Sequence, residues 1–379
     1  MSSIRKLELE IDAETYPAVE RTLIDGIAAG TSPPTVMQWT FDSDLFLEVG
    51  PVEDASLIDR ERASEEGINY GRRYNVSGGT GFFQGDNSPV LYMFFPDRGK
   101  RQMTEYIDLA GEAMATALRE SGVDDAVYRD GGDIELEPSE PGGQYAKVGV
   151  SGAGYQDGVW GVFMNLINWT FSPDKFAIID DVLQLPKEKF EDKETDSAAG
   201  RMTSLSDVAP DVDVATVLDE AERQLADLYD GTVEAGELTG EEQSKIDEHR
   251  EFFSSDEWFE RYSTQDVVDA AGPDDRVAEV AYKGRKLIKV SLCVSPDGTI
   301  KDAVFTGDMY HRPCFTAIEH LTEAVIGEPL DDDAALLGAI EDVFADDDVE
   351  IPWLPPDDFL QPLVRARDNL VSPDDFDRT

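Results

Sequence analysis

Cysteine is nearly absent from this chain, which has only Cys293 and Cys314 among its 379 residues. Two cysteines exclude a disulfide framework of the kind that stabilises small secreted domains, and we expect both thiols to stay reduced. His311 lies close to Cys314 in the sequence, but a structural zinc site needs four ligands and no third or fourth ligand is apparent. The sequence therefore gives no basis for a zinc site here.

Long apolar runs are also missing. No run reaches the roughly 18 residues that a membrane span needs, and the start, Met1–Lys6, leads into charge instead of the apolar core of a signal peptide. A basic surplus is missing as well, since 32 Lys and Arg face 81 Asp and Glu. Without a basic face or an N-terminal helix-turn-helix, nucleic-acid binding is not expected. We expect a cytoplasmic protein that binds neither membranes nor nucleic acids.

The formal charge of −49 has two explanations. A protein that binds basic partners carries its acidic residues in blocks, whereas here the carboxylates are scattered among ordinary core residues. This distribution favours a halophilic protein, adapted to molar salt inside the cell. The 41% of hydrophobic residues is enough for real cores. The charge predicts a fold that loosens at low ionic strength, where repulsion is unscreened.

The pattern of apolar residues predicts an α+β protein of two domains. The first, residues 1–262, alternates short strands with helical stripes at Met103–Leu118 and Val214–Leu228, and we expect a mixed, largely antiparallel sheet. A polar, turn-rich linker is predicted at 263–275. The second domain, residues 276–379, opens with a three-stranded meander and continues with two helices, which predicts a small α+β domain.

The most informative segment is Arg72–Thr80, in which two arginines lead into the glycine turn Ser77-Gly78-Gly79-Thr80. Glycine lets the backbone approach an anion closely, successive N–H groups line such a turn, and guanidinium groups add donors. The turn is thus a candidate site for a phosphate or carboxylate. The alternative is an ordinary tight turn.

Three further segments accompany this turn. Asp130–Leu136 places Asp133 at the start of a strand, where it can hold Mg²⁺ or a ribose hydroxyl or simply be solvated. Lys147–Tyr155 is a strand of small residues that lets a ligand or another backbone come close. Arg201–Leu205 is a polar-to-apolar passage into a helix.

In this order the four segments resemble the lipoate-protein ligase family, within the wider group of biotin and lipoate ligases. The family pattern runs from Arg-Arg-x-Ser-Gly-Gly-Gly, through an Asn-Asp pair and a Lys-(Val/Ile)-x-Gly-x-Ala strand, to Arg-Val-Thr-Asn-Leu. Trp258 stands where the family often has a tryptophan, and Phe305–Tyr310 is similar to a Phe-x-Gly-Asp-Phe-Phe signature of its accessory domain. The resemblance implies a biotin/lipoate ligase-like catalytic domain plus an accessory domain.

The resemblance also implies a reaction and its residues. Lipoate would react with ATP to give lipoyl-AMP, and the lipoyl group would pass to a lysine of a carrier domain, in a 2-oxoacid dehydrogenase acyltransferase subunit or a glycine cleavage H-type protein. Lys147 is the implied catalytic residue, and Asp133 is the implied ligand of Mg²⁺. Substrate and ATP binding would fall to Arg72, Arg73, Ser77, Gly78, Gly79, Thr80, Ser151, Gly152 and Ala153.

The departures from the family pattern leave a second hypothesis open. Tyr74-Asn75-Val76 adds two residues before the serine, and aligning Val150-Ser151-Gly152 with the family strand places Gly149 where the catalytic lysine should be. Lys147 then stands two residues upstream, on the same face of a regular strand, and a bulge is needed to close the gap. The alternative is a catalytically degenerate paralogue that binds a lipoyl carrier domain or an acyl ligand without turnover. Residues 1–262 contain no cysteine, which disfavours an octanoyltransferase that works through a thioester.

Overall fold

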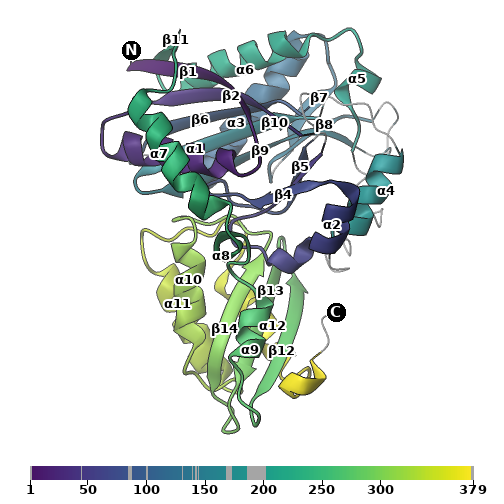
Figure 1. The fold of residues 1–379 in the computed structure, drawn as a ribbon, viewed down its shortest axis with the longest axis vertical. Helices are drawn as coiled ribbons and strands as arrows, with labels where there is room; N and C mark the ends of the chain where they lie inside the picture. Colours follow the sequence, from purple (N-terminus) through teal and green to yellow (C-terminus); the bar gives the residue numbers. More distant parts are fainter. Residues whose placement is uncertain are drawn as a thin grey trace.

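The structure is a computed structural model that describes residues 2–43, 45–83, 88–99, 101–129, 131–138, 140, 143, 145–167, 173–185 and 202–376. The N-terminal part, residues 2–262, is built on an eight-stranded mixed sheet (Figure 1). In spatial order its strands are β11 (Gly231–Ala235), β1 (Ser2–Ile11), β2 (Thr35–Phe41), β6 (Val90–Pro96), β10 (Val159–Leu166), β9 (Ala146–Gln156), β8 (Asp133–Leu136) and β7 (Ala126–Arg129). Only β1 pairs in parallel, with β2 and β11, so the predicted largely antiparallel sheet is confirmed.

Both faces of this sheet are covered. Along β6, Leu91, Met93 and Phe95 belong to one core cluster, and the alternating residues Val90, Tyr92 and Phe94 belong to another. The first cluster is formed with α3 (Met103–Glu120) and α6 (Val214–Leu228), and the second with α1 (Thr15–Ala28) and α7 (Gly240–Phe253). The apolar stripe of α3 is fully buried, as its helical spacing predicts.

A small three-stranded sheet lies at one side of the N-terminal part. It has the order β4 (Asn69–Arg72), β3 (Phe46–Val49), β5 (Gly81–Phe83), with β3 and β4 parallel. It is accompanied by a 3₁₀ turn (Ala55–Leu57), α2 (Arg60–Glu66) and α4 (Pro173–Val182). The glycine turn therefore connects β4 to β5, where this small sheet meets the large one. The helices α5 (Leu205–Val208) and α8 (Asp256–Phe259) complete the N-terminal part.

The C-terminal part, residues 263–376, contains the predicted meander of β12 (Arg276–Lys283), β13 (Leu287–Val294) and β14 (Ile300–Gly307). The predicted helices are α10 (Thr316–Val325) and α11 (Asp333–Phe344), and a further helix, α12 (Pro356–Ala366), follows them. The range predicted as a linker contains a short helix, α9 (Thr264–Asp269), whose Val267 is buried against the sheet. A 3₁₀ turn (Pro373–Asp375) follows near the end of the described residues.

The two parts share one apolar core. The cluster that contains α1 continues into the C-terminal sheet and helices, and it includes Phe315. The Phe315 ring lies 5.9 Å from that of Tyr74 and 5.7 Å from that of Trp258, between centroids. The C-terminal part, which lies below the N-terminal part in Figure 1, is thus packed against it. The boundaries 1–262 and 276–379 stay a prediction.

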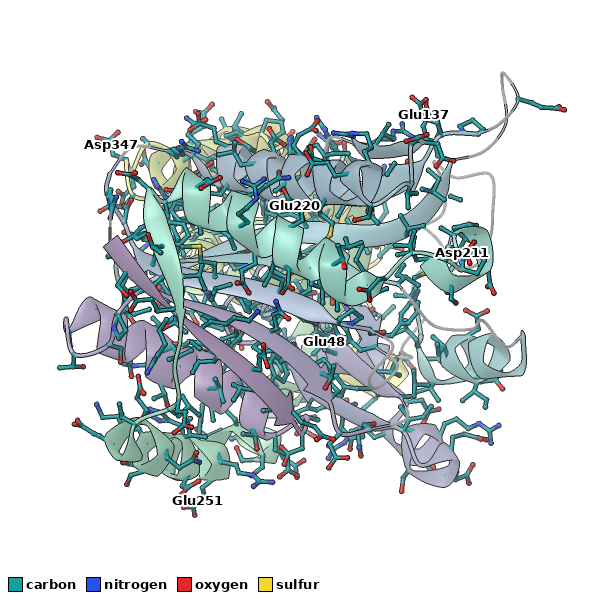
Figure 2. All side chains as sticks on the ribbon, turned by 90° about the horizontal axis from the view of Figure 1, so that it is seen from above. Glu48, Glu137, Asp211, Glu220, Glu251 and Asp347 are labelled. Atoms are coloured by element: carbon teal, nitrogen blue, oxygen red, sulfur yellow. The ribbon has the colours of Figure 1, made fainter. Side chains whose placement is uncertain are left out.

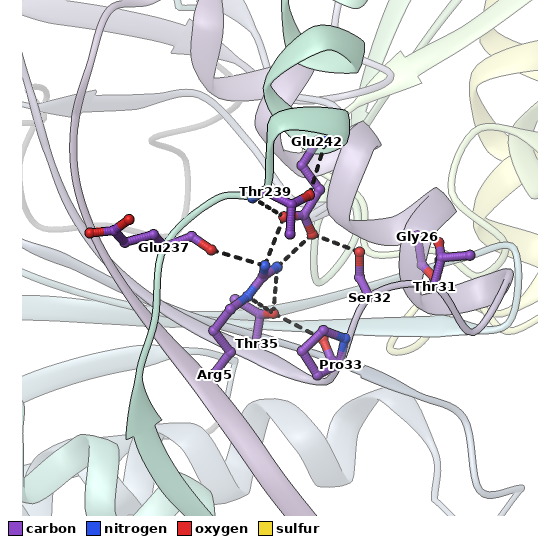
Figure 3. A network of polar contacts seen from close by, with 9 residues as sticks. All are labelled: Arg5, Gly26, Thr31, Ser32, Pro33, Thr35, Glu237, Thr239 and Glu242. Atoms are coloured by element: carbon purple, nitrogen blue, oxygen red, sulfur yellow. Dashed lines mark hydrogen bonds and ion pairs between the residues drawn. The ribbon is translucent and has the colours of Figure 1, made fainter.

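A buried ion pair ties the first strand to α7 (Figure 3). Arg5 of β1 donates two hydrogen bonds of 2.7 Å to the two carboxylate oxygens of Glu242, and Ser32 donates a third. Glu242 also closes the capping box of α7, because its carboxylate accepts from the N–H of Thr239. Burial opposes ionisation of Glu242, but these hydrogen bonds outweigh it and lower its pKa to about 2.

Most acidic side chains lie on the outside, as Glu137, Glu251 and Asp347 do in Figure 2, whereas Glu48 lies in the interior. Within the described ranges, no helix is both long and apolar enough to cross a bilayer.

Candidate active site

A cavity of about 450 Å³ opens where the glycine turn, β8, β9 and the C-terminal part meet. Nine of the residues singled out in the sequence line it: Arg73, Ser77, Gly78, Gly79, Thr80, Asp133, Lys147, Ser151 and Gly152. Arg72 and Ala153 do not. Asp130 and Arg201, the first residues of two of the predicted segments, lie outside the described residues. Met202, which follows Arg201, lines the cavity.

Arg72 is a buried structural residue and not a wall of the cavity. Its guanidinium donates six hydrogen bonds, all to backbone carbonyl oxygens, of Gly50, Pro51, Glu53, Phe259 and Arg261. Its own carbonyl accepts from the indole N–H of Trp258 at 3.1 Å. Adjacent side chains at the end of a strand point to opposite faces. Arg72 therefore points into the protein and connects backbone segments, whereas Arg73 points to the cavity.

Arg73 holds the glycine turn from the cavity side. One of its nitrogens lies 2.5 Å from Glu48, and another donates to the carbonyl oxygens of Gly78 and Gly79 at 3.2 and 2.8 Å. Burial works against the charge, but the adjacent Glu48 outweighs it and raises the pKa of Arg73. No sequence motif points to Glu48, which is buried and lies on β3.

A second buried carboxylate lies close to this pair. Glu20 of α1 is fully buried, and burial together with the charge of Glu48 raises its pKa to about 8. One of its oxygens accepts from the N–H of Tyr74, and the other has no hydrogen-bond partner among the described residues. Arg73 thus faces two carboxyl groups, of which Glu48 is the direct partner.

The glycine turn has a left-handed residue, Gly78, with φ of 109°. Its N–H is already occupied, because it donates to the carbonyl of Met309 at 2.9 Å. The Ser77 hydroxyl contacts the backbone of His311, and the Thr80 hydroxyl donates to Glu53 at 2.6 Å. The turn is therefore fixed by both parts of the molecule, and its Gly78 N–H is bonded within the protein, whereas the binding of an anion by the turn stays a prediction.

Lys147 reaches the cavity because β9 contains a bulge. Ile134 of β8 faces Gly149, but the next residue, Glu135, faces Lys147, so Val148 is an extra residue. Val148 is buried in the core under α3, and a Cβ added to Gly149 would point the same way, 3.4 Å from Ile134 and Leu166. Lys147 and Gly149 were expected to share a face of the strand. The bulge instead separates them, and Lys147 lines the cavity.

The ammonium group of Lys147 lies 2.6 Å from the Asp133 carboxylate. The carbonyl of Lys147 accepts from the N–H of Thr203, which aligns the fourth motif segment beside β9. Asp133, the first residue of β8, follows two glycines with φ of 104° and 100°. Three segments far apart in the sequence are thus joined around one lysine.

The glycines of β9 make room mainly for another part of the backbone. A Cβ on Gly154 would lie 2.1 Å from the carbonyl oxygen of Asn75, and one on Gly152 would lie 2.9 Å from Val76. The inserted residues Tyr74–Val76 therefore pack on this strand. Ser151 lines the cavity, but its hydroxyl donates to a carbonyl of α3 at 3.1 Å, and Ala153 is buried on that same side.

The C-terminal part adds five cavity residues that sequence reasoning did not identify: Lys283, Arg285, Lys286, Asp308 and Tyr310. Asp308 and Tyr310 belong to the segment that resembles the accessory-domain signature. The cavity wall as a whole has five cationic and three acidic side chains, in a protein with 81 acidic and 32 basic residues. Phe82, Phe83, Phe163 and Ile167 add apolar surface. The cavity is suited to an elongated molecule with an apolar portion and an anionic portion.

Comparison with known proteins agrees with this geometry. The bipartite lipoate protein ligase of Thermoplasma acidophilum has 19% identity and a TM-score of 0.55, over 69% of this chain and 98% of that chain. LipL1 of P. falciparum, solved in complex with lipoate, has 12% identity and a TM-score of 0.62, over 92% of this chain and 95% of that chain. A lipoate-protein ligase A bound with ATP has 17% identity and a TM-score of 0.54, over 69% of this chain and 100% of that chain. These structures share the fold.

No curated protein matches the sequence. The family model described as the lipoyl protein ligase A/B catalytic domain matches residues 12–226, which is more than half of the chain. The match includes the glycine turn, Asp133, Lys147 and the bulged strand. The chain is therefore a member of the lipoyl protein ligase A/B catalytic domain family.

Proposed function

We propose that this protein is an ATP-dependent lipoate-protein ligase. The lipoate carboxylate attacks the α-phosphate of ATP, giving lipoyl-AMP and pyrophosphate. The ε-amine of a lysine on a lipoyl-accepting carrier domain then attacks the acyl carbon and releases AMP. The observation that carries this proposal is the position of Lys147, which the bulge directs into a cavity that has both cationic and apolar walls.

The residues of the cavity fit the charges that develop in the first step. Negative charge grows on the phosphoryl oxygens, and fixed cations in a partly enclosed site stabilise it. Lys147 is the proposed catalytic residue, since its ammonium is held at the cavity wall by Asp133. Arg73 has a positioning role, because its contacts hold the backbone of Gly78 and Gly79.

The proposed cofactors are ATP, lipoate and Mg²⁺. Bound Mg²⁺ would neutralise charge on the phosphates, and it often needs only one or two protein carboxylates besides phosphate oxygens and water. The described residues contain no group of three metal-ligating side chains. Asp133 fits such a role once its contact with Lys147 is exchanged for one between Lys147 and phosphate. The cavity's apolar residues Phe82, Phe163 and Ile167 would accept the acyl chain.

The proposed partner is a carrier domain, because transfer requires a lysine outside this chain. The Thermoplasma acidophilum structure concerns a lipoylation system with an E2 lipoyl domain. We propose the same class of acceptor here, a 2-oxoacid dehydrogenase acyltransferase subunit or a glycine cleavage H-type protein.

The test is lipoate-dependent exchange of labelled pyrophosphate into ATP, at molar potassium chloride so that the acidic fold stays compact. The wild-type protein should catalyse exchange, and Lys147→Ala should abolish it. Lys245→Ala is the matched control, because Lys245 is a half-exposed lysine of α7 outside the cavity. Its exchange rate should equal that of the wild type.

Two results would contradict the proposal at different points. Full exchange by Lys147→Ala would remove the catalytic role of Lys147 and leave the ligase assignment intact. No exchange by the wild type, with lipoate still binding, would replace the ligase by a non-catalytic paralogue.

A further inference from the structure

The hairpin between β12 and β13 brings a group of cations into the active-site cavity from the C-terminal part. Lys283, Arg285 and Lys286 follow one another around the turn and line the same cavity as Arg73 and Lys147. None of the three belongs to the core of the meander, which consists of apolar residues on its strands.

The lysines of this hairpin differ from the other cavity cations in their partners. Arg73 is paired with Glu48, and Lys147 is paired with Asp133. Among the described residues, neither Lys283 nor Lys286 forms an ion pair with a carboxylate; the ammonium of Lys283 contacts only a carbonyl oxygen, of Arg285, at 3.5 Å. Both lysines are partly buried. Two positive charges without a carboxylate partner at a cavity wall are costly in isolation and favour an anionic ligand.

Tyr310 fixes the position of this hairpin over the glycine turn. Its hydroxyl oxygen lies 3.2, 3.4 and 3.7 Å from where a Cβ would stand on Gly78, Gly132 and Gly152. Glycines from three segments thus leave room for the Tyr310 ring of the C-terminal part to pack on them. The ammonium of Lys286 lies 4.9 Å from the centroid of that ring and 5.3 Å from that of Trp353. These cation–π contacts hold the charge at the cavity.

We propose that Lys283 and Lys286 bind the phosphate chain of the nucleotide, and the pyrophosphate that leaves it, from the C-terminal part. This inference rests on the proposed ligase function for the identity of the ligand. Lys147 and the glycine turn then act at the α-phosphate, while the hairpin lysines neutralise the phosphates beyond it. The C-terminal part is accordingly a component of the active site as well as a second folded part.

The experiment is calorimetric titration of sodium pyrophosphate into the full chain in molar potassium chloride. Lys283→Gln and Lys286→Gln should each raise the dissociation constant about tenfold, the loss of one charge-assisted contact, and the double variant should lose more. Lys286→Arg should keep most of the affinity, because it retains the cation over Tyr310. Lys245→Gln, the half-exposed control on α7, should bind pyrophosphate as the wild type does.

Lipoate titration in the same variants provides the internal check, because the hairpin lysines should not change lipoate affinity if the acyl group binds at the apolar wall. Wild-type affinity for pyrophosphate in the double variant, or no pyrophosphate binding by the wild type, would overturn the inference. If the wild type catalyses exchange but the double variant binds pyrophosphate as tightly as the wild type, this inference is refuted and the proposed function stands. Lysine-dependent pyrophosphate binding without exchange activity would support the anion site and refute the ligase.

Discussion

Replacing Arg72 by methionine tests whether this motif arginine is structural. The substitution keeps a long apolar side chain but removes six hydrogen bonds to five buried carbonyl oxygens. These oxygens belong to the Gly50–Glu53 segment and to the chain around Phe259, which Arg72 connects. No cavity-lining group is lost.

The magnitude follows from two opposing contributions. Four of these carbonyl oxygens lose their partner, because that of Gly50 still accepts from the N–H of Glu53. At about 1 kcal/mol each, the low end for a buried acceptor, they destabilise the fold by about 4 kcal/mol. Removing a buried charge offsets part of this. Burial lowers the pKa of Arg72 to about 10, a penalty on the charged form of about 3 kcal/mol. The free energy of unfolding should therefore fall by about 1 kcal/mol.

The assay is urea unfolding at molar potassium chloride, followed by tryptophan fluorescence. Arg223→Met is the control, because Arg223 is exposed and pairs with Glu220 and Asp227 of its own helix at the surface, so its loss should change stability by less than about 0.5 kcal/mol. Where Arg72→Met is folded, its affinity for pyrophosphate should be that of the wild type. Unchanged stability together with lost pyrophosphate or ATP binding would refute the structural role and restore Arg72 to the binding site.

Three other perturbations follow from features described above. Moving the lysine from position 147 to 149, in the double variant Lys147→Ala and Gly149→Lys, should not restore pyrophosphate exchange. A Cβ on Gly149 would lie 2.6 Å from the Asn165 carbonyl oxygen and face away from the cavity. Recovered exchange would contradict the side-chain directions that we assign to the bulge. The pKa of Glu242 is about 2 in the folded protein, below its ordinary value of 4.5. The ionised carboxylate therefore stabilises the fold above pH 4.5, and this stabilisation is lost as the pH falls towards 2. Glu242→Gln should remove this component from the pH dependence of urea unfolding between pH 5 and pH 2. Lowering potassium chloride from molar to about 0.1 M should reduce the urea midpoint of the wild type through unscreened repulsion of its −49 charge; an unchanged midpoint would refute the salt-adapted interpretation.

Several parts of the fold are predictable from local pattern. The stripe that starts at Met103 has helical spacing and forms α3, and the turn residues between apolar runs place the meander correctly. Helix α12 is not among the two helices that the sequence predicts, and it contains Pro356 and Pro362, a residue type that disfavours a helix interior. The first is tolerated because it stands in the first turn, where its missing N–H has no partner to lose.

Site residues can be predicted only where residues adjacent in the sequence form a recognisable motif. Arg73, Lys147 and Asp133 stand in recognisable segments, but Glu48, the partner of Arg73, lies on a strand without a motif. Tyr310 and the hairpin lysines come to the cavity through packing between the two parts, which depends on contacts remote in sequence. Arg72 and Arg73 are adjacent and chemically identical, so only the direction of each side chain separates their roles.

The bulge at Val148 has a consequence for how relatives of this protein are compared. The additional residue within β9 turns Lys147 towards the cavity, whereas Gly149, two residues further along the chain, faces away from it. A column-by-column alignment that matches Val150-Ser151-Gly152 to the family strand registers Gly149 at the position of the lysine and classifies such a protein as an inactive homologue. Whether an essential residue has been lost in a family of enzymes is therefore better judged by superposing the structures than by aligning the sequences without gaps.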